Sequence, residues 1–161
     1  MNKTVKTLLY LLPIAVLAFF VYSYFHVSGS EIDGVADIGP DCTVTVEKSL
    51  AVYSTKLGSY TLTPEGMDAL RELLLDSSFT RELSNVVRVD DYDQYDLRIE
   101  FPDGRDPLIA TVLGGKFLSA VNRFDGKHLK INTPDFKERL EEIQERIRQE
   151  QERLARIQKA T

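Results

Sequence analysis

The chain has one cysteine, two histidines and no tryptophan, and these shortages exclude several kinds of protein. A single cysteine cannot build the internal disulfide framework of a small secreted scaffold. Basic residues are also in deficit, 20 against 25 acidic ones, which gives a formal net charge of −5. An acidic chain lacks the positive surface that holds nucleic acid, so no nucleic-acid partner is expected.

Catalytic signatures are missing as well. The chain has no Gly-x-Ser-x-Gly elbow, no His-Glu-x-x-His pair and no phosphate-binding loop. His128 and Cys42 could in principle form a nucleophile–base pair. However, each opens an alternating segment typical of a strand, where Cys42 would be buried or, as an alternative, paired between chains. We therefore expect a protein that is not an enzyme and uses no cofactor.

What the sequence does have is a long uncharged apolar run from Leu8 to Phe25. It approaches the ~20 residues that a helix needs to cross ~30 Å of hydrocarbon, so we predict a transmembrane anchor within residues 1–27. Lys3 and Lys6 precede the run and acidic residues follow it, which by the positive-inside rule places the N-terminus in the cytoplasm. The residues expected to contact lipid are Leu8, Leu12, Ile14, Leu17 and Phe20.

The competing interpretation is a signal peptide cleaved near residue 29 or 30, where Val27-Ser28-Gly29-Ser30 offers small residues. The apolar run is longer than the ~7–15 residues of a signal-peptide core, which favours an uncleaved anchor. We expect a single-pass protein of the cell membrane that contacts the lipid bilayer through its N-terminal helix. Everything after residue 27 would then be extracytoplasmic, with secretion after cleavage as the alternative.

Residues 28–41 are rich in glycine, serine and aspartate and lack periodicity, so we predict a flexible acidic tether there. Residues 42–133 carry the signals of an extracytoplasmic α+β domain. Cys42–Glu47 alternates apolar and polar side chains as a strand does. Thr63 and Pro64 form a helix start, and apolar residues at helical spacing follow them until about residue 76.

The strongest sheet signal comes next. Leu97, Ile99 and Phe101 alternate with charged residues, which predicts a strand with one buried face. Apolar segments at 108–113, 117–121 and 128–132 follow, separated by turn sequences such as Gly114-Gly115. Four consecutive strands with short turns form an antiparallel meander, and the preceding helix would pack on one face of it.

An acidic cluster precedes the meander. Its carboxylates are Asp90, Asp91, Asp93 and Asp96. Carboxylates on one loop can bind Ca²⁺, but the EF-hand pattern fails because glycine and the closing glutamate are absent. We expect a solvated loop without a metal, with these four residues as the candidates if a metal binds. Interleaved tyrosines, Tyr92 and Tyr95, could belong to an exposed aromatic binding face together with Tyr53 and Tyr60, although those two could equally complete the core.

Residues 134–161 predict a long, charged, amphipathic helix with Thr133 as its cap and Pro134 at its first position. Its apolar seam consists of Phe136, Leu140, Ile143, Ile147, Leu154 and Ile157. Glu150 interrupts the heptad pattern, which favours packing of the first half on the sheet. The second half could pair with a protein partner or with another copy of the chain.

The anchor, the short β start, the helix opened by Thr63-Pro64 and the meander through Tyr95–Asn132 resemble the small membrane-tethered or secreted domains of unknown function of Gram-positive bacteria. The resemblance covers most of the chain and implies no particular function or site residue. We expect a non-catalytic binding or scaffolding domain. The alternatives are an extracytoplasmic enzyme with an unrecognised site and an oligomer assembled through the C-terminal helix.

Overall fold

The computed structural model describes residues 3–50, 55–83, 93–120 and 128–160, except for the side chains of 3–9, 55–56, 120, 154–155 and 158–160. The strands are β1 (His26–Ser28), β2 (Thr43–Leu50), β3 (Thr55–Thr61), β4 (Ser78–Arg81), β5 (Asp93–Glu100), β6 (Leu108–Leu113), β7 (Phe117–Ala120) and β8 (His128–Ile131). The helices are α1 (Lys3–Phe25), α2 (Pro64–Leu75) and α3 (Phe136–Ala160), and η1 (Gly29–Glu31) is a short 3₁₀ turn.

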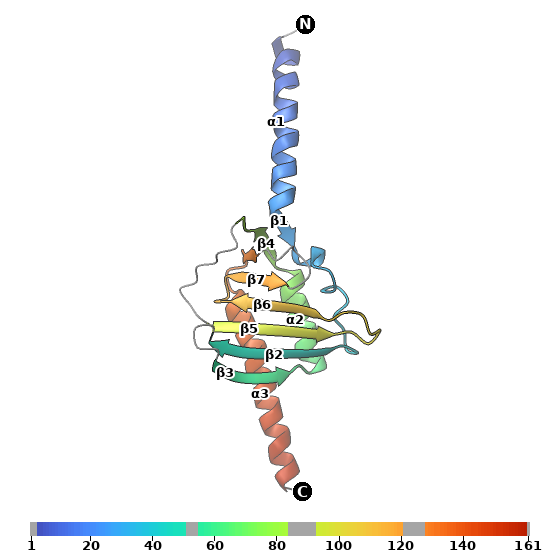
Figure 1. The fold of residues 1–161 in the computed structure, drawn as a ribbon, viewed down its shortest axis with the longest axis vertical. Coiled ribbons are helices and arrows are strands. Elements are labelled where there is room, and N and C mark those ends of the chain that lie inside the picture. Colours follow the sequence, from blue (N-terminus) through green and yellow to red (C-terminus); the bar gives the residue numbers. More distant parts are fainter. Residues whose placement is uncertain (1–2, 51–54, 84–92, 121–127, 161) are drawn as a thin grey trace.

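The strands form one antiparallel sheet in the order β1-β4-β8-β7-β6-β5-β2-β3, and the fold is α+β. Figure 1 shows α2 and α3 together behind the sheet. In the same view α1 projects from the β1 end of the molecule, whereas the C-terminal part of α3 projects from the β3 end. The two chain ends therefore lie at opposite ends of the long axis.

The local signals for α2 and for the meander are confirmed. The Thr63 hydroxyl accepts a hydrogen bond from the backbone N–H of Gly66, and Pro64 opens the helix. Strands β5 to β8 are neighbours in chain order, and Gly114 and Gly115 both adopt positive φ in the tight turn between β6 and β7. The apolar face of α2 is fully covered, with Leu70 and Leu73 0% exposed.

The meander is nevertheless only the middle of a larger sheet. The hairpin of β2 and β3 adds to β5 on one side, and β4 and β1 add to β8 on the other. Neither β1 nor β4 has a clear alternating pattern, because each has only three or four residues. Their pairing places Val27 opposite Phe79, and both side chains are buried.

The prediction of a flexible tether at residues 28–41 is wrong. The backbone N–H groups of Ile32, Val35 and Ile38 donate to the carbonyls of Gly29, Ile32 and Val35, so the segment is a series of tight turns closed by bonds between residues three apart. These turns bring Ile32, Val35 and Ile38 to one side, where each is 2% exposed or less. A Cβ on Gly29 would overlap the carbonyl oxygen of Leu74, so this segment packs closely against the end of α2.

The start of α3 also differs from its prediction. The helix begins at Phe136 rather than Pro134, and the Thr133 hydroxyl accepts a hydrogen bond from the backbone N–H of Ser78 at 3.4 Å. Thr133 thus links α3 to β4 instead of capping the helix. The hydroxyl of Thr133 thus bonds to a segment 55 residues away in the sequence instead of forming the local cap that its position favours.

Candidate functional site

A cluster of charged side chains joins the sheet to α3. Lys48 of β2 lies 3.3 Å from a carboxylate oxygen of Asp93 on β5 and 2.9 Å from one of Glu141 on α3. Lys137 of α3 contacts Asp93 at 3.1 Å, and the hydroxyl of Tyr95 donates to Glu141 at 2.5 Å. We call these five residues the interface cluster. The positive charges of its two lysines offset the negative charges of its two carboxylates, between strands β2 and β5 and helix α3.

The interface cluster favours the charged forms of Lys48 and Glu141. Partial burial acts to lower the pKa of Lys48, but its hydrogen bonds to Glu141 and Asp93 outweigh burial and raise that pKa. Burial likewise acts to raise the pKa of Glu141, yet the hydrogen bonds from Tyr95 and Lys48 lower it below its ordinary value. A lysine held as a cation and a glutamate held as an anion suit binding and cohesion better than proton transfer.

A cavity of about 330 Å³ opens beside this cluster, between β3 and α3. It is lined by Lys48, Leu57, Tyr60, Glu141, Gln144, Glu145 and Arg148. The side chain of Gln144 belongs to a residue only 7% exposed, and its Nε2 has no hydrogen-bond partner among the described residues. An unsatisfied buried amide costs roughly 1–3 kcal/mol, so this donor is the most unusual polar group of the cavity.

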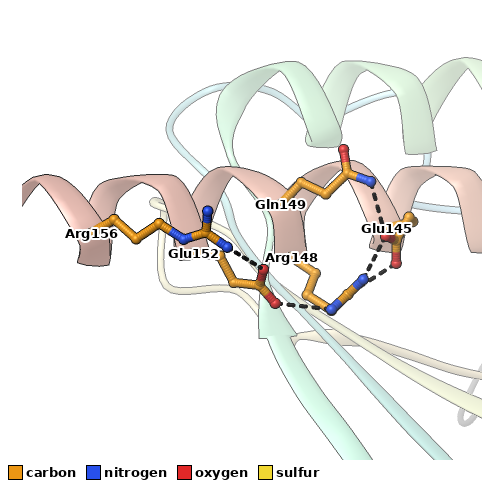
Figure 2. Close-up of polar contacts among 5 residues, drawn as sticks. All are labelled: Glu145, Arg148, Gln149, Glu152 and Arg156. Carbon is orange, nitrogen blue, oxygen red and sulfur yellow. Dashed lines mark hydrogen bonds and ion pairs between the residues drawn. The ribbon is translucent and has the colours of Figure 1, made fainter.

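Charged residues continue along α3 past the cavity, as Figure 2 shows. Arg148 contacts Glu145 at 2.7 Å and Glu152 at 2.9 Å, and Glu152 lies 3.9 Å from Arg156. The hydrogen bond from Arg148, aided by one from Gln149, lowers the pKa of Glu145 to about 2. This row of alternating charge keeps the exposed helix surface solvated and gives it no net preference for an ion of either sign.

No family model, curated protein or solved structure matches this chain. The candidate site therefore stands on its own geometry.

The acidic candidates for a metal site do not converge. Asp93 and Asp96 are three residues apart on β5, so their side chains point to opposite faces of the sheet. Asp93 joins the interface cluster, whereas Asp96 accepts from the Thr111 hydroxyl at 2.7 Å on the uncovered face. Asp90 and Asp91 lie outside the described residues, within which no group of three potential metal ligands occurs.

The Cys42–His128 pair is ruled out by topology. Cys42 immediately precedes β2, and His128 begins β8 with β5, β6 and β7 between them. At ~4.8 Å per strand the two residues are roughly 19 Å apart across the sheet. The prediction that Cys42 is buried is confirmed, since it is 7% exposed and its thiol donates to the carbonyl of Asp37 at 3.6 Å.

The predicted tyrosine face is corrected in part. Tyr95 is 0% exposed and belongs to the interface cluster, so it cannot contribute to an exposed surface. Tyr60 packs against the core and also lines the cavity. Tyr53 and Tyr92 lie outside the described residues.

The C-terminal seam divides as its charge pattern suggests. Its first four members, Phe136, Leu140, Ile143 and Ile147, are buried against the sheet and α2. Ile157 is 54% exposed, and the side chain of Leu154 is not described. The first half of the seam is therefore occupied within the molecule.

The side chains predicted to contact lipid are exposed on α1. Leu12, Ile14, Leu17 and Phe20 are between 62% and 65% exposed, and the side chain of Leu8 is not described. Over the part of the chain that is described, no helix meets the length and hydropathy required of a membrane span.

The residues that form the cavity and the interface cluster escaped the sequence analysis, apart from Asp93, Tyr60 and Tyr95. Gln144 could have been found, because it stands four residues after Leu140 and three before Ile147, on the buried stripe of α3. Lys48 and Glu141 carry no such signal. They are 93 residues apart, and only the packing of α3 on β2 brings them together.

Proposed function

We propose that this chain is a single-pass membrane protein whose extracytoplasmic α+β body is a non-catalytic binding or scaffolding module. The observation that carries the proposal is the apolar surface of α1. Figure 1 shows α1 projecting away from the body, and its large side chains are exposed, with Leu11 at 56%, Leu17 at 65% and Phe19 at 66%. A helix with apolar side chains on all sides requires an apolar medium around it.

The free energy of transferring the apolar side chains of α1 from water into lipid is large. Fully burying one side chain of this size is worth about 1.5–3 kcal/mol. The large side chains of this row are 45–74% exposed, so transferring their exposed part into lipid is worth on the order of 10–20 kcal/mol. The row extends from Tyr10 to Tyr24 and contains no charged residue. Thr7, Leu8 and Leu9 continue the uncharged sequence toward Lys6, and the positive-inside rule then assigns the N-terminus to the cytoplasm.

The body would be mounted on this anchor rather than tethered to it. Helix α1 ends at Phe25 and β1 begins at His26, so no linker separates the anchor from the sheet. Tyr22 stacks on His26 with ring centroids 5.1 Å apart, and the Arg81 guanidinium lies 5.4 Å from the ring of Tyr24. Such an aromatic and basic collar suits the headgroup layer.

The fold argues for an uncleaved anchor. Cleavage near residue 29 or 30 would remove β1, including Val27, which is 1% exposed in the core. The edge of β4 and the side chain of Phe79 would lose their cover, because β1 is the strand that pairs with β4 on that side. A signal peptide would not be expected to contribute a core strand to the mature protein.

Reporter fusions at Thr161 test the proposal. A phosphatase that is active only outside the cytoplasm should be active, and a cytoplasm-only fluorescent reporter at the same site should be dark. The protein should stay with membranes in alkaline carbonate and keep the mass of the full chain. Recovery in the soluble fraction would refute the anchor, inverted reporter activity would refute the orientation, and a mass shortened by about 30 residues would support secretion after cleavage.

Self-association through the end of α3 is a second candidate, favoured by the 54% exposed Ile157 on a helix that extends beyond the body (Figure 1). Sedimentation of the chain with and without residues 148–161 tests whether these residues drive self-association. A monomer in both cases removes this candidate.

A further inference from the structure

Two strands form the edges of the sheet among the described residues, and they differ in length. Strand β1 forms one edge, but it is three residues long and continues directly into α1. Strand β3 forms the other edge, at the end of the body away from α1 (Figure 1). An edge strand presents backbone N–H and C=O groups that another chain can pair with. With seven residues against three, the β3 edge offers a partner strand the longer pairing surface.

The register of β3 identifies the outward groups. The backbone N–H of Leu62 donates to the carbonyl of Val44, so Leu62 is hydrogen-bonded toward β2. Hydrogen-bonded residues alternate along an antiparallel strand, and this turns the backbone groups of Ser59 and Thr61 away from β2. No described strand pairs with β3 on that outer side. An added strand could therefore form hydrogen bonds with the backbone N–H and C=O groups of both residues.

The cavity of about 330 Å³ lies directly behind this edge. Leu57 and Tyr60 of β3 form one wall, and Gln144, Glu145 and Arg148 of α3 form the other. In Figure 1 α3 passes behind β3 and continues beyond it, so a strand added to β3 would run over this stretch of the helix. Side chains of an extended peptide point alternately to the two faces, and every second one would face α3.

Glycine at position 58 shapes the mouth of this cavity. A Cβ there would lie 2.8 Å from Cζ of Tyr60, so the tyrosine ring lies flat along the strand only because position 58 carries no side chain. Leu57 beside it is 50% exposed. The edge thus combines unpaired backbone with an aromatic and aliphatic rim around a polar interior.

We propose that β3 and the cavity behind it bind an extended peptide by strand addition, with a neutral amide side chain of that peptide, asparagine or glutamine, inserted beside Gln144. The cavity favours a neutral guest because its charges are already paired, Lys48 with Glu141 at 2.9 Å and Arg148 with Glu145 at 2.7 Å. A charged guest would lose its hydration without a free counter-charge. The unpartnered Nε2 of Gln144 is covered by neighbouring atoms, so the Gln144 side chain must rotate toward the cavity before Nε2 donates to the guest amide, which can itself donate to a lining carboxylate.

The site deepens the binding role proposed above and does not depend on the membrane topology, which the reporter fusions test separately. The probes are acetylated, amidated peptides Thr-Val-Thr-X-Thr-Val-Thr in which X is Gln, Asn, Leu, Glu or Lys, titrated onto the full chain in lipid nanodiscs. Backbone amide signals of Ser59 and Thr61 and the side-chain amide of Gln144 report binding by NMR. We expect all three NMR signals to shift when X is Gln or Asn. These two peptides should bind at least about threefold more tightly than the peptides in which X is Leu, Glu or Lys.

Ser59→Pro is the decisive variant, because it removes an outward N–H without touching a bond to β2. It should weaken the Gln peptide by about tenfold, whereas Ser59→Ala, which keeps the N–H, should not. Gln144→Leu should abolish the preference for Gln over Leu peptides. Circular dichroism and thermal melting verify that each variant is folded. If Ser59→Pro does not fold, peptides with N-methyl groups on alternate residues test the same strand pairing, because methylation removes the peptide's own N–H donors to β3.

Three results would overturn the proposal. One is the absence of shifts at Ser59 and Thr61 with every peptide up to about 1 mM. Another is binding that is unaffected by both Ser59→Pro and peptide methylation, or that does not depend on X. The third is a chitin oligosaccharide that shifts the Gln144 signals when no peptide does, since the cavity would then belong to a glycan.

Discussion

Substituting Ile32 by alanine tests whether residues 28–41 are part of the packed body. Ile32 is 2% exposed, so its side chain is completely removed from water in the folded chain. Ile→Ala deletes three carbon atoms at about 0.8 kcal/mol each, which gives a transfer loss of about 2.4 kcal/mol. The cavity left behind adds to this, and comparable core truncations cost 2–5 kcal/mol. A segment that hung free in solvent would show no such loss.

The assay is urea unfolding of the full chain in micelles, followed by circular dichroism. With a slope of about 1.5 kcal/mol/M, the midpoint should fall by roughly 2 M. Asp41→Ala is the matched control, because Asp41 is exposed at the other end of the same segment and its substitution should change stability by less than about 0.5 kcal/mol. Equal midpoints for the two variants would refute the packing argument and restore a flexible tether.

Three further predictions follow from individual contacts. Gly29→Ala should destabilise the fold by about 1–3 kcal/mol because the new Cβ meets the Leu74 carbonyl, whereas Gly39→Ala, whose Cβ would meet only an oxygen at 3.9 Å, should be neutral in the same unfolding assay. Tyr95→Phe should cost about 1.5–3 kcal/mol, since it removes the hydrogen bond to the Glu141 carboxylate, and a stability equal to wild type would contradict a structural role for that bond. Because the pKa of Glu141 is lowered in the fold, its stabilising effect is complete above its ordinary value of 4.5 and is lost as the pH falls below it. Unfolding titrations of Glu141→Gln should therefore show a weaker loss of stability on acidification than wild type, and parallel curves would count against the interface cluster.

Local signals along the chain were sufficient for part of the fold. The Thr63 cap and the following proline start α2 because both act on the first turn of the helix itself. The alternation of Leu97 and Ile99 predicts a half-buried strand, and the two glycines after Leu113 predict a tight turn, because strand faces and turn conformations depend on neighbouring residues. The antiparallel meander and its covering helix follow from these elements.

Contacts between distant segments decided the rest. The three-residue strand β1 exists only because β4 lies beside it, and the turns that bury Ile32 are stable only against the end of α2. Asp93 and Asp96 are only three residues apart, yet the pleat of β5 directs one side chain toward α3 and the other to the opposite face. Gln144 faces the cavity because α3 crosses behind β3 (Figure 1). Amino-acid order determines which face of each element is apolar, but the free energy that selects among pairings arises when those faces meet across the molecule.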